Sequence, residues 1–196
     1  MAKSKSAAAR AQPLALELLM ADHRKVEDLF EQYDQEKESD DGTRREIAQR
    51  ICTELTIHAQ VEEELFYPWL RENLDEDEME MLEEAQVEHN TAKDLIAQIE
   101  AATDIDEVYN AKVKVLGEYI KHHVQEEENE IFPEVRGEHE ELDELGQEMS
   151  ARKGELQEEL GVVPDEADED EEEGELDASG RGRKPQPGES TRRGPR

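Results

Sequence analysis

The sequence contains little sulfur and few aromatic residues, and it has no long apolar run. Cys52 is the single cysteine among 196 residues, so neither an intrachain disulfide nor a thiolate-based zinc or iron–sulfur site can form. Only 4% of the residues are aromatic, which leaves enough apolar side chains for a helical core but few for a β-sandwich. No apolar run is as long as a membrane span or the apolar part of a signal peptide. We therefore expect a cytoplasmic protein with Cys52 as a small core residue.

Basic residues are far fewer than acidic ones, since 40% of the residues are charged and the formal net charge is −32. A chain with this balance repels nucleic acids and anionic membranes and attracts cations. We therefore expect metal ions as partners, and neither nucleic acid nor a membrane. Acidic surfaces are also typical of proteins that stay soluble at high salt. The sequence identifies no protein partner.

Apolar residues recur with helical spacing in four long stretches, which cover about residues 14–37, 43–72, 77–102 and 104–135. The breaks between them, ESDDG, NLDED and TDID, are short, and strand patterns are absent. Thr43 and Glu46 resemble a capping box, and Thr103 with Asp106 predicts another cap. The pattern predicts an all-α fold, an antiparallel up-down four-helix bundle.

The composition divides the chain into four parts. Residues 1–13 are basic and small and are predicted to be a disordered N-terminus, and residues 14–136 form the bundle. Residues 137–160 predict an additional amphipathic helix. Residues 161–196 are first acidic and then rich in Gly, Pro and Arg, and such a segment is predicted to be a disordered tail.

Each of the four predicted helices carries one histidine on its apolar stripe. In an up-down bundle, two residues lie at the same height when the turn falls midway between them. The midpoints between successive histidines fall in ESDDG, in NLDED and in TDID. All four imidazoles are therefore predicted to share one layer of the core. These histidines are His23, His58, His89 and His123.

Glutamates follow two of these histidines by one helical turn. Glu62 lies four residues after His58, and Glu127 lies four residues after His123, so each pair shares a helix face. In both copies an aromatic residue and a proline follow, and the proline lies ten residues after the histidine. Because a buried carboxylate is costly unless it is paired or bound to metal, the set predicts a metal centre rather than a plain polar core.

The four segments DHRKVEDLF, IHAQVEEELFYP, VEHNTAKDL and HHVQEEENEIFP together resemble the hemerythrin-like, HHE-type cation-binding family. The resemblance covers about residues 14–136. It implies a four-helix bundle around a non-haem centre of two iron ions, bridged by two carboxylates and capped by histidines. By position, it implies the metal ligands His23, His58, Glu62, His89, His123 and Glu127.

Two positions differ from the oxygen-carrying hemerythrins. Those proteins have a further histidine one turn after the third-helix histidine, where this chain has Lys93. They also use an aspartate five residues after the last histidine, whereas Glu127 lies at four. The substitution at Lys93 implies a more open, reactive or sensory site, with Lys93 carrying its ammonium outward. Other candidates are substitute ligands at Glu63, Glu88 and Glu126, and a His122–Glu126 pair in place of His123–Glu127.

Three functions remain from the sequence. The leading hypothesis is a non-haem di-iron protein that binds or senses O2, a related small ligand or iron itself. Histidine and carboxylate ligands without thiolate suit Fe, Mn or Zn, and the resemblance favours iron. The second hypothesis is a di-iron enzyme that acts on peroxide or Fe(II). The third is a metal-independent acidic interaction module. Motifs of other enzyme classes, such as a P-loop or a dinucleotide fingerprint, are absent.

Overall fold

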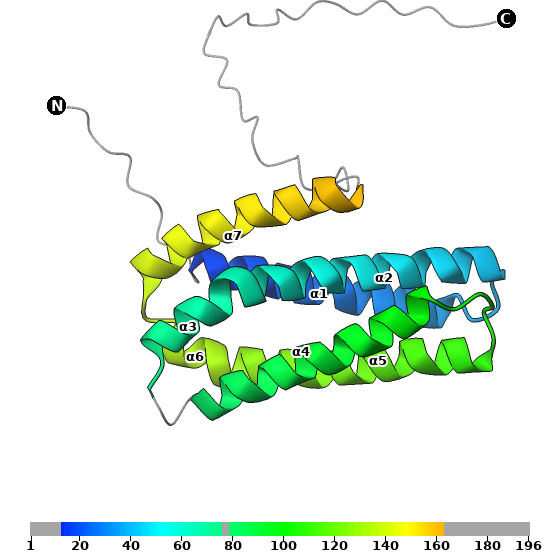
Figure 1. Cartoon of the computed structure of the whole chain (residues 1–196), viewed down its shortest axis with the longest axis horizontal. Coiled ribbons are helices and arrows are strands. Elements are labelled where there is room, and N and C mark those ends of the chain that lie inside the picture. Colours follow the sequence, from blue (N-terminus) through cyan, green and yellow to red (C-terminus); the bar gives the residue numbers. More distant parts are fainter. Residues whose placement is uncertain (1–12, 76–78, 163–196) are drawn as a thin grey trace, which may run out of the picture. The chain divides into compact units, whose positions relative to one another are not determined.

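A computed structural model of the chain describes residues 13–75 and 79–162, and within these residues all regular structure is helical (Figure 1). The α-helices are α1 Leu14–Gln35, α2 Asp41–Val61, α3 Tyr67–Asn73, α4 Met79–Glu100, α5 Glu107–Glu126, α6 Phe132–Val135 and α7 His139–Leu160. Two π-helical turns, η1 Glu62–Phe66 and η2 Glu127–Ile131, join α2 to α3 and α5 to α6. No helix in this described part is long and apolar enough to cross a membrane.

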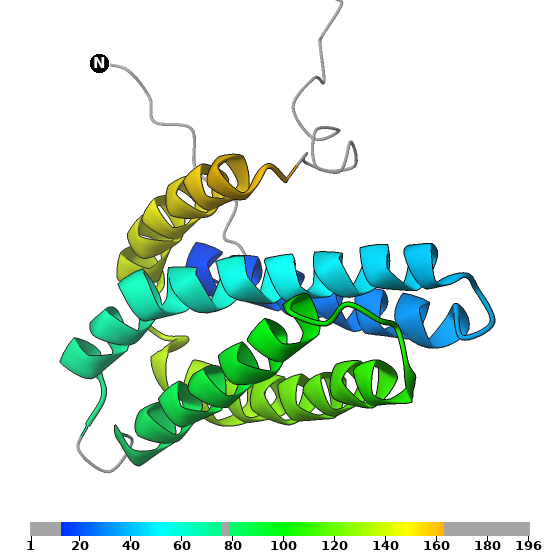
Figure 2. The same ribbon diagram turned by 45° about the vertical axis from the view of Figure 1, so that its right-hand side comes forward.

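The helices form the antiparallel up-down bundle that the sequence predicts. α1 and α2 run side by side in opposite directions, and α4 and α5 form a second antiparallel pair, as Figures 1 and 2 both show. α7 packs across the outside of α1 and α2. The all-α prediction and the additional helix are therefore confirmed. The predicted disorder of the N-terminus and of the tail concerns residues that lie outside the described ones, apart from Pro13, Gly161 and Val162.

The cap predicted from Thr103 and Asp106 is confirmed for Asp106 only, since α5 begins at Glu107, and the capping box at Thr43 is wrong. Asp106 accepts a hydrogen bond from the backbone N–H of Tyr109, 2.8 Å away. α2 begins earlier than predicted because Asp40 caps it, accepting from the backbone N–H groups of Gly42 and Thr43. A carboxylate at this position satisfies amide donors that have no partner inside the helix.

α7 is held against the first helix by a close backbone contact. A Cβ atom added at Gly146 would lie 2.5 Å from the backbone nitrogen of Ala15, so only glycine permits this approach. The Asp143 carboxylate accepts a hydrogen bond from the backbone N–H of Leu14 and so satisfies a free donor at the start of α1. α7 ends at Gly161, whose φ of 68° places it in the left-handed region.

The two π-helical turns begin at the two predicted carboxylate ligands. In each turn the backbone N–H five residues after the glutamate donates to the glutamate carbonyl, from Tyr67 to Glu62 and from Phe132 to Glu127. The next residue is a proline, which lacks an N–H and would clash with the carbonyl four residues before it in a continuing α-helix. The wider turn lets each proline enter the first turn of a new helix instead.

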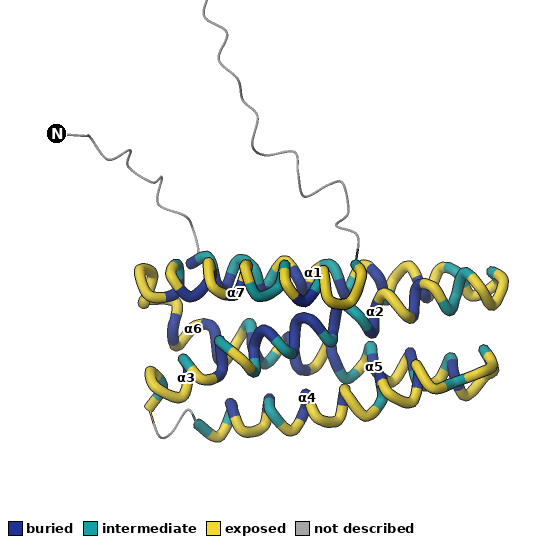
Figure 3. The backbone as a smooth tube through the Cα atoms, turned by 45° about the horizontal axis from the view of Figure 1, so that its top comes forward, coloured by how far each residue is buried: buried dark blue, intermediate teal, exposed yellow. Residues whose placement is uncertain are grey.

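The core has two apolar clusters with a polar layer between them. Figure 3 shows where buried residues lie along the helices. One cluster lies at the α7 end and includes Leu16, Leu70 and Leu82. The other surrounds Ile51, Cys52 and Leu116, so the prediction of Cys52 as a core residue is confirmed. Buried charged and polar residues separate the two clusters.

Candidate metal centre

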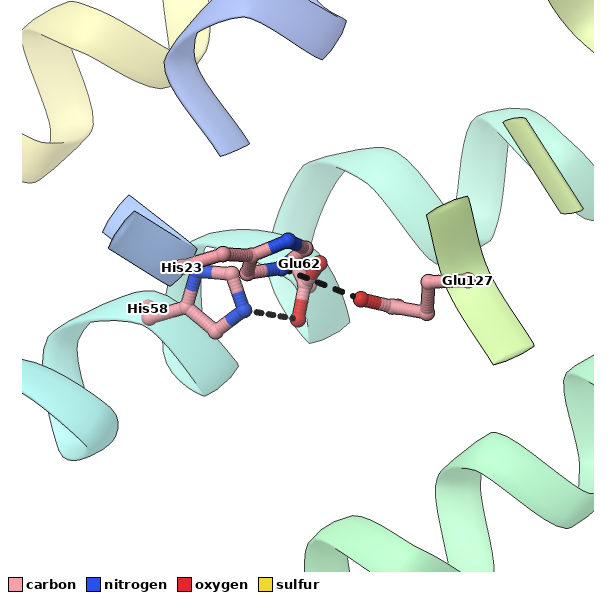
Figure 4. A group of neighbouring side chains, drawn as sticks. All are labelled: His23, His58, Glu62 and Glu127. Atoms are coloured by element: carbon pink, nitrogen blue, oxygen red, sulfur yellow. Dashed lines mark ion pairs between the residues drawn. The ribbon is translucent and has the colours of Figure 1, made fainter. Parts of the chain in front are cut away.

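The structure brings all six sequence-predicted ligands together in this polar layer. α1 supplies one of the histidines, α2 another and η1 the first glutamate, while α4 and α5 supply the other two histidines and η2 the second glutamate. All six are buried. They form two groups whose candidate ligand atoms lie within 4.8 Å of one another, namely His23, His58, Glu62 and Glu127 (Figure 4), and Glu62, His89, His123 and Glu127.

Each glutamate lies between one histidine of each group. Oε2 of Glu62 lies 3.1 Å from Nε2 of His58 and 3.3 Å from Nε2 of His89. Oε2 of Glu127 lies 3.3 Å from Nε2 of His23 and 3.6 Å from Nε2 of His123. Both carboxylates therefore occupy the position of a bridge between two neighbouring groups of ligands.

The polar atoms at the middle of the layer lack hydrogen-bond partners among the described residues. Both carboxylate oxygens of Glu62, Oε2 of Glu127 and Nε2 of His23 are buried and make no hydrogen bond, although histidine nitrogens lie close to both Oε2 atoms. Glu62 and Glu127 are each 0% exposed. A buried ionised carboxylate without a donor or a cation costs far more free energy than a buried neutral polar group. Imidazole and carboxylate are also the ligand types that suit Fe, Mn and Zn, so the residues present fit a metal site.

An outer ring of carboxylates faces the Nδ1 atoms of the four histidines. The outer carboxylates are Glu128 at 2.9 Å from His23, Asp22 at 3.7 Å from His58, Glu63 at 3.1 Å from His89 and Glu88 at 2.8 Å from His123. A carboxylate that accepts from Nδ1 orients the ring and leaves Nε2 free to ligate a metal. The sequence analysis did not identify this ring, although each member directly adjoins a predicted ligand in the sequence.

Three of the outer carboxylates are themselves paired with a basic side chain. Arg24 contacts Glu128, Lys153 of α7 contacts Asp22, and Lys93 contacts Glu63. The His89 imidazole and the Lys93 ammonium lower the pKa of Glu63, despite its partial burial, to about 2. These pairs hold the outer carboxylates ionised, and α7 thereby takes part in positioning the site.

The carboxylates control the charge of the buried histidines. Burial disfavours the imidazolium form of His23, but the hydrogen bonds and charges of Glu127 and Glu128 outweigh burial and raise its pKa to about 10. The same opposition, with Glu62 and Glu63 as partners, raises the pKa of His89 to about 9. Without a metal, protons therefore supply the positive charge that the carboxylates require.

Tyr67 is a site residue that the sequence analysis did not single out. Its hydroxyl donates to Oε1 of Glu127 at 3.0 Å, and its ring stacks on His89 with centroids 5.2 Å apart. The sequence analysis placed it only within an aromatic segment after His58. The sequence feature that could have identified Tyr67 is its position directly before Pro68. The π-helical turn that precedes this proline brings both Phe66 and Tyr67 into the core.

The alternative ligands from the sequence do not enter either group. Glu63 and Glu88 support histidines through Nδ1, and Lys93 turns to Glu63 with its side chain 44% exposed. The expectation that Lys93 carries its ammonium outward to a carboxylate is confirmed. His122 is exposed and pairs with Glu126 at 3.0 Å, so it does not replace His123 in the layer.

A small cavity of about 20 Å³ adjoins all four histidines. Its volume is about that of one water-sized molecule. Apart from the histidines, Asp22 and Lys93, the walls are aliphatic and come from Val26, Leu55, Ala59, Ala92, Ile96, Ile120 and Val124. A small apolar molecule in this space would lie beside the four histidines and would touch mostly aliphatic surface.

Comparisons with known proteins agree with this site. A family model described as the hemerythrin HHE cation binding domain matches residues 14–135. A solved structure of a hemerythrin HHE cation binding domain-containing protein from Mycobacterium kansasii has the same fold, with a TM-score of 0.63 and 22% identity, over 76% of this chain and 90% of that one. A protein named DNA nickase from Nostoc sp. (strain PCC 7120 / SAG 25.82 / UTEX 2576) is 30% identical over 147 residues. Those residues are 74% of this chain but only 40% of the nickase, so the chain spans less than half of that relative.

The family match covers the four helices that carry the histidines and both π-helical turns that carry the glutamates. It ends at Val135, so α7 lies beyond the matched region. The match over more than half of the sequence and the buried histidine–glutamate layer lead to one assignment: the chain belongs to the hemerythrin HHE cation-binding domain family.

Proposed function

We propose that this chain is a non-haem di-iron protein that binds or senses O2 or a related small ligand. The observation that carries the proposal is the pair of ligand groups that share Glu62 and Glu127. Two shared carboxylates and two histidines for each group suit two neighbouring cations of like charge, because bridging anions lie between them. Imidazole and carboxylate donors suit Fe, Mn or Zn, and the resemblance to the hemerythrin-like family favours iron among them.

The residues around the ligands have defined tasks in this proposal. Glu128, Glu63 and Glu88 accept from Nδ1 of their histidines and so hold these three imidazoles with Nε2 toward the metal position. Asp22 lies beside Nδ1 of His58 at 3.7 Å. Tyr67 donates to Glu127 and fixes the orientation of that carboxylate. Phe132 stacks on His23 with ring planes 9° apart, and with Phe66 it shields the layer from water. When bound, the irons would supply the redox chemistry and the attachment point for the small ligand.

The cavity supports a small, weakly polar ligand rather than a larger substrate. The cavity can hold about one diatomic or water-sized molecule. Its aliphatic walls offer few hydrogen-bond partners, so they favour a weakly polar molecule over a polar one. The cavity lies on the histidine side of the layer, where a ligand can reach the metal positions without displacing Glu62 or Glu127.

The test is metal analysis of protein purified without added metal, combined with anaerobic titration. We expect two irons per chain and an absorption spectrum that changes when the Fe(II) protein meets O2 or nitric oxide. Glu62→Gln should reduce iron content, whereas Glu118→Gln, an exposed glutamate on α5, should not. A wild type that takes up no more iron than Glu62→Gln would contradict the proposal.

A second candidate is a di-iron enzyme that acts on peroxide. Lys93 favours it, because the side chain one turn after His89 turns away and supplies no further ligand to that group. Fewer protein ligands leave more positions for an exogenous molecule. Steady consumption of peroxide by the iron-loaded protein, lost in His58→Ala, would select this candidate over simple binding.

Two other roles receive less support. A metal-independent interaction module would not explain why both carboxylate oxygens of fully buried Glu62, and Oε2 of fully buried Glu127, lack a hydrogen-bond donor among the described residues. We do not propose nickase activity, because the chain spans 40% of the relative of that name and its net charge of −32 opposes approach to nucleic-acid phosphates. If the protein kept its fold and still bound a partner after complete removal of metal, the interaction-module hypothesis would be supported.

A further inference from the structure

Glu88 differs from the other three outer carboxylates in the side chains that surround it. The other three each contact Arg or Lys, but within the described residues no basic side chain other than histidine pairs with Glu88. Behind Glu88 lie His122 and Glu126 of α5. One possible ligand atom from each of these three residues lies within 4.8 Å of the other two.

The three residues have the chemistry and exposure of an outer cation site. His122 and Glu126 are one helical turn apart, and Nε2 of His122 lies 3.0 Å from Oε1 of Glu126. Their side chains are 60% and 32% exposed, so an ion from solvent can reach them, whereas the Glu88 side chain is 8% exposed. One imidazole and two carboxylates from neighbouring helices make a ligand set for a divalent transition-metal ion.

A pocket lined by two of these three residues, Glu88 and Glu126, reaches the buried layer. It has a volume of about 30 Å³ and is lined by four glutamates, Glu84, Glu88, Glu126 and Glu130, and on its inner side by His123 and Glu127. Glu127 is fully buried, and its Oε2 has no hydrogen-bond donor among the described residues. The pocket therefore has an acidic mouth, and at its inner end lies a buried carboxylate with one oxygen that lacks a hydrogen-bond donor among the described residues.

We propose that Glu88, His122 and Glu126 form a third, outer site for a divalent cation, and that this site delivers cations through the acidic pocket to the buried centre. Glu88 is the shared element, because its Oε2 faces Nδ1 of His123 while the residue also belongs to the outer cluster. The outer site stands on its own residues. Its delivery role rests on the proposed metal centre.

The delivery role follows from electrostatics and exposure. A mouth lined by one sign of charge raises the local concentration of the opposite ion and increases association rates by about 10- to 1000-fold. The exposed ligands of His122 and Glu126 exchange with solvent, so a cation held there is bound more weakly than one between Glu62 and Glu127. A weak outer site beside a tight inner one suits transfer inward.

The experiment uses the full chain, freed of metal, with Zn(II) for stoichiometry and Co(II) for kinetics. Equilibrium dialysis should show two tightly bound Zn(II) and one weaker Zn(II) in wild type, and loss of the weaker one in His122→Ala/Glu126→Gln. Stopped-flow absorbance of Co(II) should show that the variant fills the buried centre about tenfold more slowly, with the same final occupancy. The wild-type rate should fall more steeply with ionic strength than that of the variant.

His139→Ala/Glu118→Gln is the matched control, since it makes the same two changes at exposed positions outside the pocket. Circular dichroism would verify that both variants fold. If wild type binds no cation beyond the inner ones, the His122–Glu126 contact is an ion pair only and the outer site is wrong. If the outer cation is lost without any change in filling rate, the delivery role is wrong. One weak cation per chain, with none at the centre, would support the outer site but contradict the proposed metal centre.

Discussion

The hydroxyl of Tyr67 donates to Oε1 of Glu127 across the bundle, and this 3.0 Å hydrogen bond joins the first residue of α3 to the π-helical turn η2. We predict that Tyr67→Phe lowers the free energy of unfolding of the metal-free protein by about 1–3 kcal/mol, because a buried carboxylate oxygen loses its donor. It should also weaken metal binding, since Glu127 is no longer held in place. Urea unfolding and competition with a metal chelator measure the two effects.

Tyr33→Phe is the control for this change. The Tyr33 hydroxyl donates to Oδ1 of Asn110 at 2.7 Å, and it belongs to the apolar cluster away from the metal centre. This variant should lose stability without any change in metal affinity. Equal metal affinities for Tyr67→Phe and wild type would show that Tyr67 contributes only to packing.

The close contact between α7 and α1 predicts opposite changes in stability when two glycines of α7 are each replaced by alanine. Gly146→Ala should destabilise the protein by about 1–3 kcal/mol, because the new Cβ would overlap the backbone of Leu14 and Ala15. Gly154→Ala, on the same helix, should stabilise it by up to about 1 kcal/mol, since nothing lies within 4 Å and alanine favours the helix. Thermal unfolding of the pair tests this. A stabilising effect at both positions would mean that α7 does not pack closely on α1.

The sequence could predict the bundle and the convergence of six polar residues because both depend on periodicity and helix length. Histidines at equal distances from the turns must meet in an up-down bundle, and the structure places His23 and His123 in one layer. The capping error at Thr43 came from a local motif, whereas Asp40 offered the better-placed carboxylate.

The outer carboxylates and the π-helical turns were harder to predict. The sequence is so rich in glutamate that Glu63 or Glu128 beside a ligand carries no distinct signal. Which glutamate turns inward depends on the path of the backbone, and the π-helical turn shifts that path. Pro68 and Pro133 indicated that a regular α-helix does not continue at these positions. The apolar periodicity continues past both prolines, however, so periodicity alone does not predict a π-helical turn.

The raised pKa values of the histidines predict how stability depends on pH. In an unfolded chain a histidine has a pKa near 6.5. The folded values are about 10 for His23 and about 9 for His89. Protonation therefore stabilises the metal-free fold fully below about pH 6.5, and this contribution is lost as the pH rises through 9 to 10. Urea midpoints of metal-free protein should fall across this range.

Metal binding should release protons for the same reason. Ligation needs neutral imidazole, so a cation that binds at pH 7 displaces the protons of His23 and His89 and binds more tightly as the pH rises. Calorimetric titration with Zn(II) in buffers of different ionisation enthalpy counts the released protons. No proton release at pH 7 would show that these imidazoles are neutral before the metal binds.

The cavity predicts a separation of metal binding from small-ligand binding. Ala92→Val adds two methyl groups to its wall and should weaken binding of O2 or nitric oxide by about tenfold, equivalent to about 1.4 kcal/mol, while iron content stays the same. Ala97→Val makes the same change at an exposed position of α4 and should leave ligand affinity unchanged. Unaltered nitric oxide affinity in Ala92→Val would place the ligand elsewhere.

Lys93 offers the sharpest test of the open-site argument. It lies one turn after His89 and lines the cavity, and its ammonium contacts Glu63 rather than the ligand groups. A histidine at this position can point its imidazole into the cavity and supply one more ligand. We predict that Lys93→His retains iron more tightly and oxidises more slowly in air than wild type, because fewer positions stay open to exchange.

Lys93→Ala separates the added imidazole from the lost ion pair. It removes the contact with Glu63 but adds no ligand, so it should release iron to a chelator at least as fast as wild type. Its effect on His89 should be modest, because Gln86 still donates to Glu63 at 3.1 Å. The measurement is anaerobic loading with Fe(II), exposure to air, and spectroscopic recording of oxidation and iron release. If Lys93→His and Lys93→Ala change both rates equally, the ion pair with Glu63 controls the site and the number of protein ligands does not.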